Sequence, residues 1–494
     1  MKLEAGGEER QAGSRRLLEG ALVLGVLAVA LFLLPAPRAS ADLRFDSLYY
    51  AAQSVNLAEG RGNTMQLGGE TVPGFYPPGA PALAAPLHWL LGADLQNPVL
   101  LSGALGVLST LLLYLLGRAL AGPAAGATAA LLFLSCAPVR DVSRRVLSQP
   151  LSVAGTAGVA LLWTRGARGS AGFLAALLPL SGARDLGLPA ALAVAAPLSG
   201  GGGRAALRAG AGLAAGGALL VAANVAAHGR PFGAGYAVWG LPAGFSFRNV
   251  LHPEVTPPGE GPGFLLRSLI GLGPLYPWPV AALALLGILR APHPFRALAA
   301  AGTLFPYLLL APYWFRSILY LLPTLPFVFV AAAAGAVALC PARLRVLPVA
   351  LAAAATLPAW PASSLVAPPP PSPLVETLRA VDRAVPPDAA LLGAVHPILA
   401  EYTLRRAPAR RYLFLKPGSS PDWRRAMERE LGGLDVAGWV ASRLGEGRTV
   451  HALLLTPEAT PEEQAALGRT WSALEARFAT EPDGVPGLVR LRAR

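Results

Sequence analysis

Charged residues are scarce in this 494-residue sequence: Asp, Glu, Lys and Arg make up only 14%, whereas 54% of residues are hydrophobic. A soluble protein carries about 25% charged residues, so most of this chain has too few charges to cover a surface that faces water. The shortage excludes a wholly soluble protein. It predicts an all-α polytopic membrane protein in which charge is confined to the loops and to separate segments.

Cysteine and histidine are also rare. The two cysteines, Cys136 and Cys340, form neither a metal-binding spacing nor a disulfide framework. Among the six histidines, His228 and His252 are isolated, and we interpret His88, beside Trp89, as an amphipathic anchor at the membrane interface. We therefore predict no cofactor and no bound metal, which leaves open a divalent ion held by other ligands.

Lysine is almost missing, because only Lys2 and Lys416 accompany the arginines that give the chain its net charge of +13. Such a charge could indicate nucleic-acid binding in a soluble protein. Here, however, the cations lie in short clusters between apolar runs, which is typical of membrane edges. We expect membrane lipids and no nucleic acid among the partners.

Long apolar runs are plentiful. A helix needs about 20 apolar residues to cross a bilayer, or about 17 at the short end. About eleven transmembrane helices are predicted on this basis, at 17–34, 98–117, 122–138, 149–164, 171–183, 186–199, 206–227, 264–289, 297–312, 316–339 and 345–361. The stretch 80–91 is shorter and follows a Pro-rich turn, so we expect an interfacial helix there.

Arginines between these spans predict the orientation, because short cytoplasmic loops carry the excess of positive charge. On this rule residues 1–16 form a cytoplasmic tail, and the large loop 35–97 and the C-terminus are extracytoplasmic. The protein is then integral to the inner or plasma membrane. Ala39-Ser40-Ala41 has the form of a signal-peptide cleavage site, so removal of the first span is the alternative.

The composition changes after the predicted transmembrane domain 17–361. Residues 362–373 form a Pro-rich linker, and 374–494 have the charge and periodicity of a small extracytoplasmic α/β domain. Helices are predicted at 376–385, 397–405 and 461–478, and strands at 389–395 and 450–455.

The loop 35–97 is far longer than a plain connector. It contains Asp46-Ser47-Leu48-Tyr49-Tyr50 at the start of an expected helix, then Leu57-Ala58-Glu59-Gly60, then Tyr76-Pro77-Pro78-Gly79-Ala80-Pro81. Without further context, Asp46 is explained equally well as the N-cap of this helix.

This order of motifs resembles the polyprenyl-phosphate-dependent glycosyltransferases of the GT-C superfamily, relatives of the protein O-mannosyltransferases and the lipid A aminoarabinose transferases (family 39 type). The resemblance covers about residues 17–360. It continues in Asn224 with Gly229-Arg230-Pro231-Phe232 and Gly235-Tyr236, and in Tyr320-Leu321-Leu322-Pro323-Thr324-Leu325-Pro326.

The resemblance implies transfer of a sugar, with inversion, from a polyprenyl-phosphate donor to a glycan, lipid or protein acceptor at the outer face. Asp46 matches the family's proposed catalytic base, because an attacking acceptor must lose a proton to a carboxylate. Cations would stabilise the leaving phosphate. The candidates for that contact are Arg144, Arg145, Arg184 and Arg316, and those for acceptor or sugar contacts are Asp141, Tyr50, Tyr76 and Tyr236.

Each of these residues has a structural alternative. Arg144 and Arg145 could anchor the loop to lipid headgroups, Asp141 could pair with an arginine, and Arg184 could pair with Asp185. The sequence also departs from the family where Ser47 and Gln149 replace acids and Leu319 replaces an arginine. These departures keep an inactive scaffold as an alternative. A transporter is the other alternative, although no internal repeat supports it.

Overall fold

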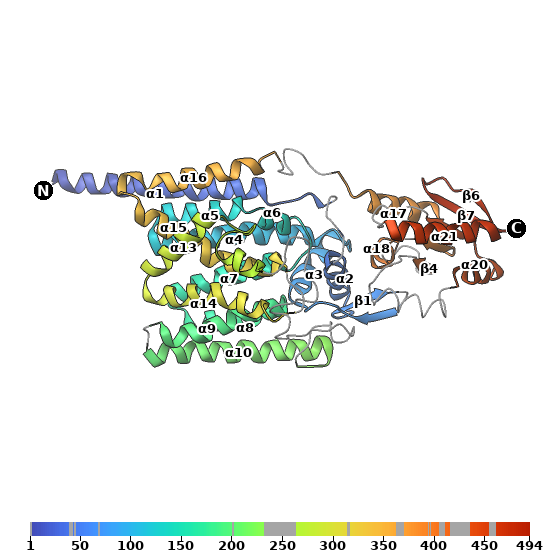
Figure 1. Ribbon diagram of the computed structural model, residues 1–494, viewed down its shortest axis with the longest axis horizontal. Helices are drawn as coiled ribbons and strands as arrows, with labels where there is room; N and C mark the ends of the chain where they lie inside the picture. Colours follow the sequence, from blue (N-terminus) through green and yellow to red (C-terminus); the bar gives the residue numbers. More distant parts are fainter. Residues whose placement is uncertain are drawn as a thin grey trace.

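The computed structural model describes residues 2–38, 43, 46–67, 70–199, 202–231, 263–313, 317–361, 370–393, 395, 397–404, 411–414, 435–453 and 461–494. It has two parts along its longest axis (Figure 1). A bundle of helices includes the N-terminus, and a smaller domain that contains a β-sheet includes the C-terminus.

The bundle is built from helices that run broadly along the long axis of the molecule (Figure 1). Their bounds are α1 Lys2–Leu33, α4 Pro98–Ala121, α5 Pro123–Ser135, α6 Ala137–Ser143, α7 Gln149–Thr164, α8 Arg168–Leu177, α9 Gly187–Leu198, α10 Gly202–His228, α12 Phe264–Leu269, α13 Trp278–Arg290, α14 His293–Leu310, α15 Leu325–Leu339 and α16 Val346–Thr356. Short 3₁₀ turns extend or join them: η2 Leu178–Leu180, η3 Ala183–Leu186, η5 Ile318–Thr324, η6 Ala342–Leu344 and η7 Leu357–Ala359.

Helix occupies most of each predicted span, but fewer helices meet the length and hydropathy of a membrane crossing. In the described part of the chain these are Pro98–Ala121, Gly203–His228, Ile318–Leu339 and Ala342–Ala359. A fifth is added if α5 and α6, which bend by 73° at their junction, count as one broken span. The chain is thus an integral membrane protein with four or five clear spans, and the total of eleven stays a prediction.

The predicted span 264–289 is not one helix. α12 ends at Leu269 and α13 begins at Trp278. Gly271 between them has a φ of +81°, and Leu272 and Pro277 form an isolated β-bridge. Proline lacks the N–H that a continuous helix requires, which explains why α13 begins only after Pro277.

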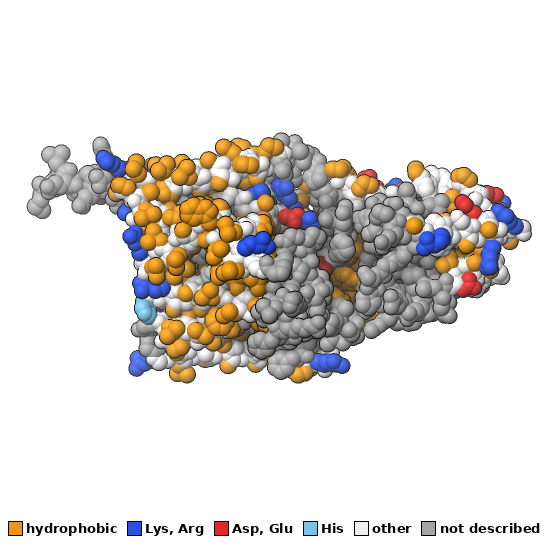
Figure 2. Space-filling view, viewed as in Figure 1, with side chains coloured by type: hydrophobic (Ala, Val, Ile, Leu, Met, Phe, Trp, Pro, Cys, Tyr) orange, Lys and Arg blue, Asp and Glu red, His pale blue; other side chains and the backbone are white. Residues whose placement is uncertain are grey.

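Hydrophobic side chains cover the visible face of the bundle, as expected for helices that meet lipid (Figure 2). Leu24 and Leu31 of α1 and Leu347 and Leu351 of α16 are among the exposed ones. Basic side chains gather along the end of the bundle where the N-terminus lies (Figure 2).

At the opposite end, loop 35–97 folds into a compact layer. Its elements are α2 Asp46–Ala58, the antiparallel strands β1 Thr64–Leu67 and β2 Glu70–Pro73, and α3 Gly79–Leu91. The side chains of Trp89 and Leu90 on α3 are 70% and 78% exposed, which agrees with the interfacial helix predicted there. The anchor interpretation of His88 was wrong, because His88 is buried and bonds to Ser54 at 2.8 Å.

The C-terminal domain contains α17 Pro373–Ala384, β3 Ala390–Gly393, α18 Pro397–Thr403, β4 Arg411–Phe414, α20 Val436–Gly445, β5 Val450–Leu453, α21 Pro461–Arg477, β6 Phe478–Pro482 and β7 Leu488–Ala493. Its sheet has the order β4-β3-β5-β7-β6, in which β3 runs parallel to β4 and β5, and β7 antiparallel to β5 and β6. The five predicted elements are present, and β4, α20, β6 and β7 are additional to them.

The C-terminal domain docks on the layer formed by loop 35–97. Val375, Leu378 and Val381 of α17 belong to the same buried cluster as Leu48 and Val55 of α2. Burial of such side chains stabilises the contact by roughly 1.5–3 kcal/mol each. The two segments predicted to share one side of the membrane therefore lie at the same end of the bundle (Figure 1).

Candidate functional site

Asp46 is the first residue of α2, at the junction between the bundle and the outer layer. The hydroxyl of Tyr76 donates a hydrogen bond of 2.5 Å to Asp46 Oδ1. Burial raises the pKa of the Asp46 carboxyl, while the Tyr76 hydrogen bond and the nearby charge of Arg184 act in the lowering direction. The position at a helix N-terminus also favours the charged form, because the macrodipole is positive there.

The backbone of Tyr76 is fixed by side chains from outside its own turn. Gln53 of α2 accepts a hydrogen bond from the Tyr76 N–H at 3.0 Å and donates one to the Tyr76 carbonyl at 2.8 Å. Asn63 donates to the same carbonyl at 3.1 Å and accepts from Gln53 at 2.7 Å. Because these groups are buried and satisfy one another, they hold the Tyr76 ring in place.

Tyr50 lies one helical turn after Asp46 and stacks on Tyr76, with ring centroids 4.2 Å apart and an interplanar angle of 11°. Its hydroxyl shares a 2.7 Å hydrogen bond with Ser148 Oγ. Burial raises the pKa of the Tyr50 phenol to about 12, so this group stays protonated at neutral pH. It is available as a hydrogen-bond donor or acceptor.

Arg184 in η3 reaches the same serine from the other side. It donates hydrogen bonds to Ser148 and, at 3.5 Å, to Ser152, and its guanidinium lies 5.5 Å from the centroid of the Tyr320 ring. Ser152 also donates to Asp185 at 2.7 Å, so a serine links the arginine to the acid proposed as its ion-pair partner. Ser148 directly precedes α7, and a helix N-terminus together with a guanidinium is a favourable surrounding for an anion.

Close packing brings the Pro-rich turn to the segment that holds Arg184. A Cβ atom on Gly79, the first residue of α3, would lie 2.6 Å from the carbonyl oxygen of Leu180. Only glycine allows this approach without a shift of the backbone. In the Tyr76-Pro77-Pro78-Gly79 motif, Gly79 therefore allows close packing against Leu180, and Tyr76 makes the polar contact with Asp46.

The other predicted phosphate contacts lie in different surroundings. Arg144 donates a hydrogen bond of 2.6 Å to the Leu33 carbonyl at the end of α1. Arg145 forms an exposed ion pair with Asp141, its neighbour one turn earlier, at 3.0 Å. These contacts match the structural alternative for Asp141 and join neither arginine to Asp46.

Arg316 and Tyr236, the remaining predicted site residues, lie outside the described residues, as does His252. Within the described ranges, no group of three or more His, Cys, Asp or Glu side chains is placed to hold a metal ion.

The sequence analysis missed several residues of the site, namely Gln53, Asn63, Ser148, Ser152 and Tyr320. One signal for Gln53 was present, because Asp46, Tyr50 and Gln53 are spaced by four and three residues and so share one face of α2. The others depend on contacts between segments that are distant in the sequence.

No protein-family model and no curated protein matches the chain. Solved structures, in contrast, are similar to it in fold. The fold is similar to that of ArnT, an aminoarabinose transferase from Cupriavidus metallidurans, in its apo state. The similarity covers 97% of this chain and 98% of the ArnT chain, with a TM-score of 0.65 and 14% sequence identity. The chain has the GT-C fold. The same transferase bound to undecaprenyl phosphate gives a TM-score of 0.63 at 13% identity, again over 97% and 98% of the two chains.

A third GT-C structure is the oligosaccharyltransferase of Archaeoglobus fulgidus in complex with zinc and sulfate. Its TM-score is 0.50 at 13% identity, over 88% of this chain and 68% of that one. The similarity thus extends from the helical bundle into the C-terminal part.

Proposed function

We propose that this protein is a membrane glycosyltransferase that transfers a sugar, with inversion, from a polyprenyl-phosphate donor to an acceptor at the extracytoplasmic face. One observation carries the proposal: a chain of contacts through Tyr76, Tyr50 and Ser148 joins a half-buried acid, Asp46, to a cation, Arg184. A general base and an anion-stabilising group are the two parts that such a transfer needs.

Asp46 is the proposed general base. An acceptor hydroxyl or amine forms a bond to the anomeric carbon with its lone pair, and its proton passes to an oxygen of the Asp46 carboxylate. The bond from the anomeric carbon to the phosphate oxygen breaks, and its electron pair leaves with the polyprenyl phosphate. Attack from the face opposite the leaving group gives inversion. Because burial raises the pKa of Asp46, its carboxylate accepts a proton more readily than an exposed aspartate would.

Arg184 is the proposed partner of the phosphate. Its guanidinium is held by Ser148 and Ser152 at the beginning of α7. A fixed cation in a site with little water stabilises the charge that develops on the leaving group. Tyr50 and Ser148 add hydroxyl groups to the same surroundings, where they would contact the sugar or the phosphate.

The similarity to ArnT supports this assignment, because one of its structures contains undecaprenyl phosphate. The C-terminal domain lies over α2 and would help to recognise a glycan, lipid or protein acceptor. The departures at Ser47 and Gln149 leave Asp46 and Arg184 in place, which favours an active enzyme over an inactive scaffold.

The test uses the purified full-length protein with a panel of radiolabelled polyprenyl-phosphate sugars and an acceptor extract from cell envelopes. We expect acceptor-dependent loss of label from the lipid, reduced by about 10²- to 10⁴-fold in Asp46→Asn, which keeps the size of the side chain and removes its charge. Glu376→Gln, an exposed acid at the start of α17, is the matched control and should transfer normally. Near-normal turnover of Asp46→Asn would refute the proposed base.

A further inference from the structure

A cavity of about 310 Å³ lies between the turn that follows α3 and helices α17 and α18 of the C-terminal domain. Its polar wall includes Asp94, Arg379, Asp382 and Arg383, and its apolar wall includes Leu95 and Val375. The volume is at the lower end of the range for small-molecule sites. None of these residues belongs to the site of Asp46.

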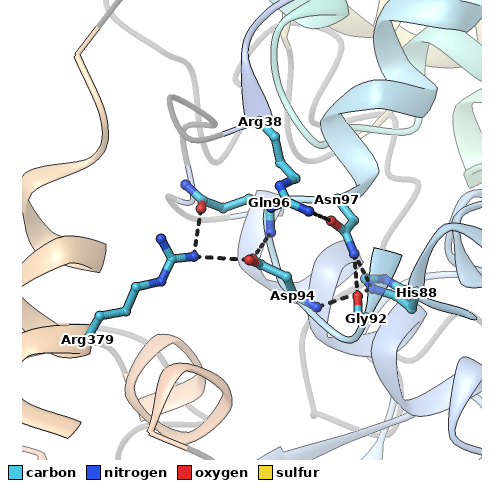
Figure 3. A network of polar contacts seen from close by, with 7 residues as sticks. All are labelled: Arg38, His88, Gly92, Asp94, Gln96, Asn97 and Arg379. Atoms are coloured by element: carbon cyan, nitrogen blue, oxygen red, sulfur yellow. Dashed lines mark hydrogen bonds and ion pairs between the residues drawn. The ribbon is translucent and has the colours of Figure 1, made fainter. Parts of the chain in front are cut away.

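The polar wall is fixed before any ligand arrives (Figure 3). Arg379 reaches from α17 to Asp94 at 3.0 Å and to Gln96 at 3.1 Å, across the junction between the two parts of the protein. Behind it, Asn97 contacts His88 at 3.2 Å and accepts a hydrogen bond from Arg38 at 3.1 Å (Figure 3). A wall that is held in this way loses little conformational entropy when a ligand binds.

The lining predicts the class of ligand. Two carboxylates and two guanidinium groups balance one another, so the cavity has no net charge to attract an anion or a cation. Carboxylates accept hydrogen bonds and guanidinium groups donate them, which suits the hydroxyl groups of a sugar. Leu95 and Val375 offer an apolar surface for the C–H faces of a sugar ring.

Tyr402 relates the cavity to the catalytic helix. It lines the cavity, and its hydroxyl donates a hydrogen bond of 2.8 Å to Asn56 of α2. Asn56 is ten residues after Asp46, a distance of about 15 Å along the helix axis. Reacting groups must approach within roughly 3.5 Å, so a ligand in the cavity is too far away to be the attacking unit.

We propose that this cavity binds a neutral oligosaccharide, as the part of the acceptor remote from the group that receives the sugar. The role of the bound oligosaccharide as part of the acceptor rests on the proposed function, whereas the existence of an oligosaccharide site does not. Binding energy from a remote part of a substrate serves to position the reacting end.

The test measures binding by isothermal titration calorimetry on the full-length protein in nanodiscs. The probes are neutral tetrasaccharides of glucose, mannose and N-acetylglucosamine, with a tetrasaccharide of galacturonic acid as the anionic comparison. Ala93→Trp places an indole at the exposed rim of the cavity, and Ala384→Trp adds the same group to an exposed position at the end of α17 that is not part of the lining. We expect at least one neutral probe to bind, about tenfold or more weakly to Ala93→Trp than to Ala384→Trp.

Three results would overturn the inference: no binding by any neutral probe, equal binding to the two variants, or tighter binding by the galacturonic acid probe. The Asp46→Asn protein separates this inference from the proposed function. It should bind the neutral probe with unchanged affinity while it no longer transfers sugar. Probe binding without transfer by the wild-type protein would refute only the proposed function.

Discussion

The hydroxyl of Tyr76 lies 2.5 Å from Asp46 Oδ1 and donates its hydrogen bond to that carboxylate, although the two residues are thirty positions apart. The contact joins the end of the β1–β2 segment to the first residue of α2. The hydrogen bond holds the carboxylate at the beginning of the helix against the aromatic side chain of Tyr76. Tyr76 therefore controls both the orientation and the proton affinity of Asp46.

Tyr76→Phe tests this control. The hydrogen bond stabilises the charged carboxylate, so its loss should raise the pKa of Asp46 further above the ordinary value. A base must be ionised to act, and the acidic limb of the pH profile of kcat/KM should therefore move to higher pH. Tyr114→Phe is the control, because the Tyr114 hydroxyl has no hydrogen-bond partner in the described part of the chain. An unshifted limb in Tyr76→Phe would exclude Asp46 as the titrating base.

Arg184→Gln should reduce kcat by about 10²- to 10³-fold, because it removes the cation proposed to stabilise the leaving phosphate. Arg145→Gln removes an exposed ion pair of small energetic value and should change transfer by less than about twofold. Arg144→Gln should lower thermal stability more than transfer, since the Leu33 carbonyl loses its donor. Initial rates and unfolding temperatures at equal protein level distinguish the three. A loss in Arg145→Gln as large as that in Arg184→Gln would reassign the phosphate contact.

Tyr402→Phe should loosen the docked C-terminal domain. The hydroxyl donates to Asn56 and accepts from the Gln66 N–H at 3.0 Å, so its removal leaves two partly or fully buried groups without this partner. The expected cost is about 1–3 kcal/mol. Hydrogen exchange of the α2 amides should accelerate, and Thr377→Ala, whose hydroxyl donates to the Pro373 carbonyl within α17, should leave it unchanged. Unaltered exchange in Tyr402→Phe would show that the apolar cluster alone holds the domain.

Mild acid should destabilise the outer layer through His88. Burial lowers the pKa of His88 to about 4, below its ordinary value of 6.5, so the unfolded state binds more protons between these values. The free energy of unfolding should then be highest above pH 6.5 and fall by about 3 kcal/mol as the pH drops to 4. Thermal unfolding from pH 7.5 to 4 measures this, with His88→Gln as the non-titrating comparison. If the unfolding temperature fell equally with pH in the wild-type protein and in His88→Gln, other groups would cause the acid sensitivity.

Hydrophobic periodicity was sufficient to predict the elements whose apolar pattern is visible in their own sequence. The apolar runs predicted helices such as α7 with its observed bounds, and α17 begins at Pro373, the last residue of the predicted Pro-rich linker. Strands β6 and β7 were missed because they pair with each other and carry partly buried charged residues such as Glu481 and Arg490, which interrupt an apolar strand pattern. Their pairing is a property of the hairpin and not of either segment alone.

The residues of the site that lie in sequence motifs could be named from the sequence, but not the contacts between them. Asp46 and Tyr50 were named from the motif that begins α2, and Tyr76 from the Pro-rich turn. The pair of Arg145 with Asp141 is local, since the two residues are one helical turn apart. The contact between Arg184 and Ser148 depends on how α7 and η3 pack. A single sequence records none of these tertiary distances.

The contact between Asn56 and Tyr402 also has a consequence for biosynthesis, because 346 residues separate the two. At roughly 5–20 residues per second, a ribosome needs about 20–70 s to extend the chain from one to the other. Asp46 is in the nascent chain from the start of that interval, and Tyr76 and Arg184 join it while α2 still lacks its final support. The maturation of this protein is therefore expected to end with the arrival of its C-terminal domain, and chains truncated before Tyr402 should insert into the membrane yet show little of the proposed transfer activity.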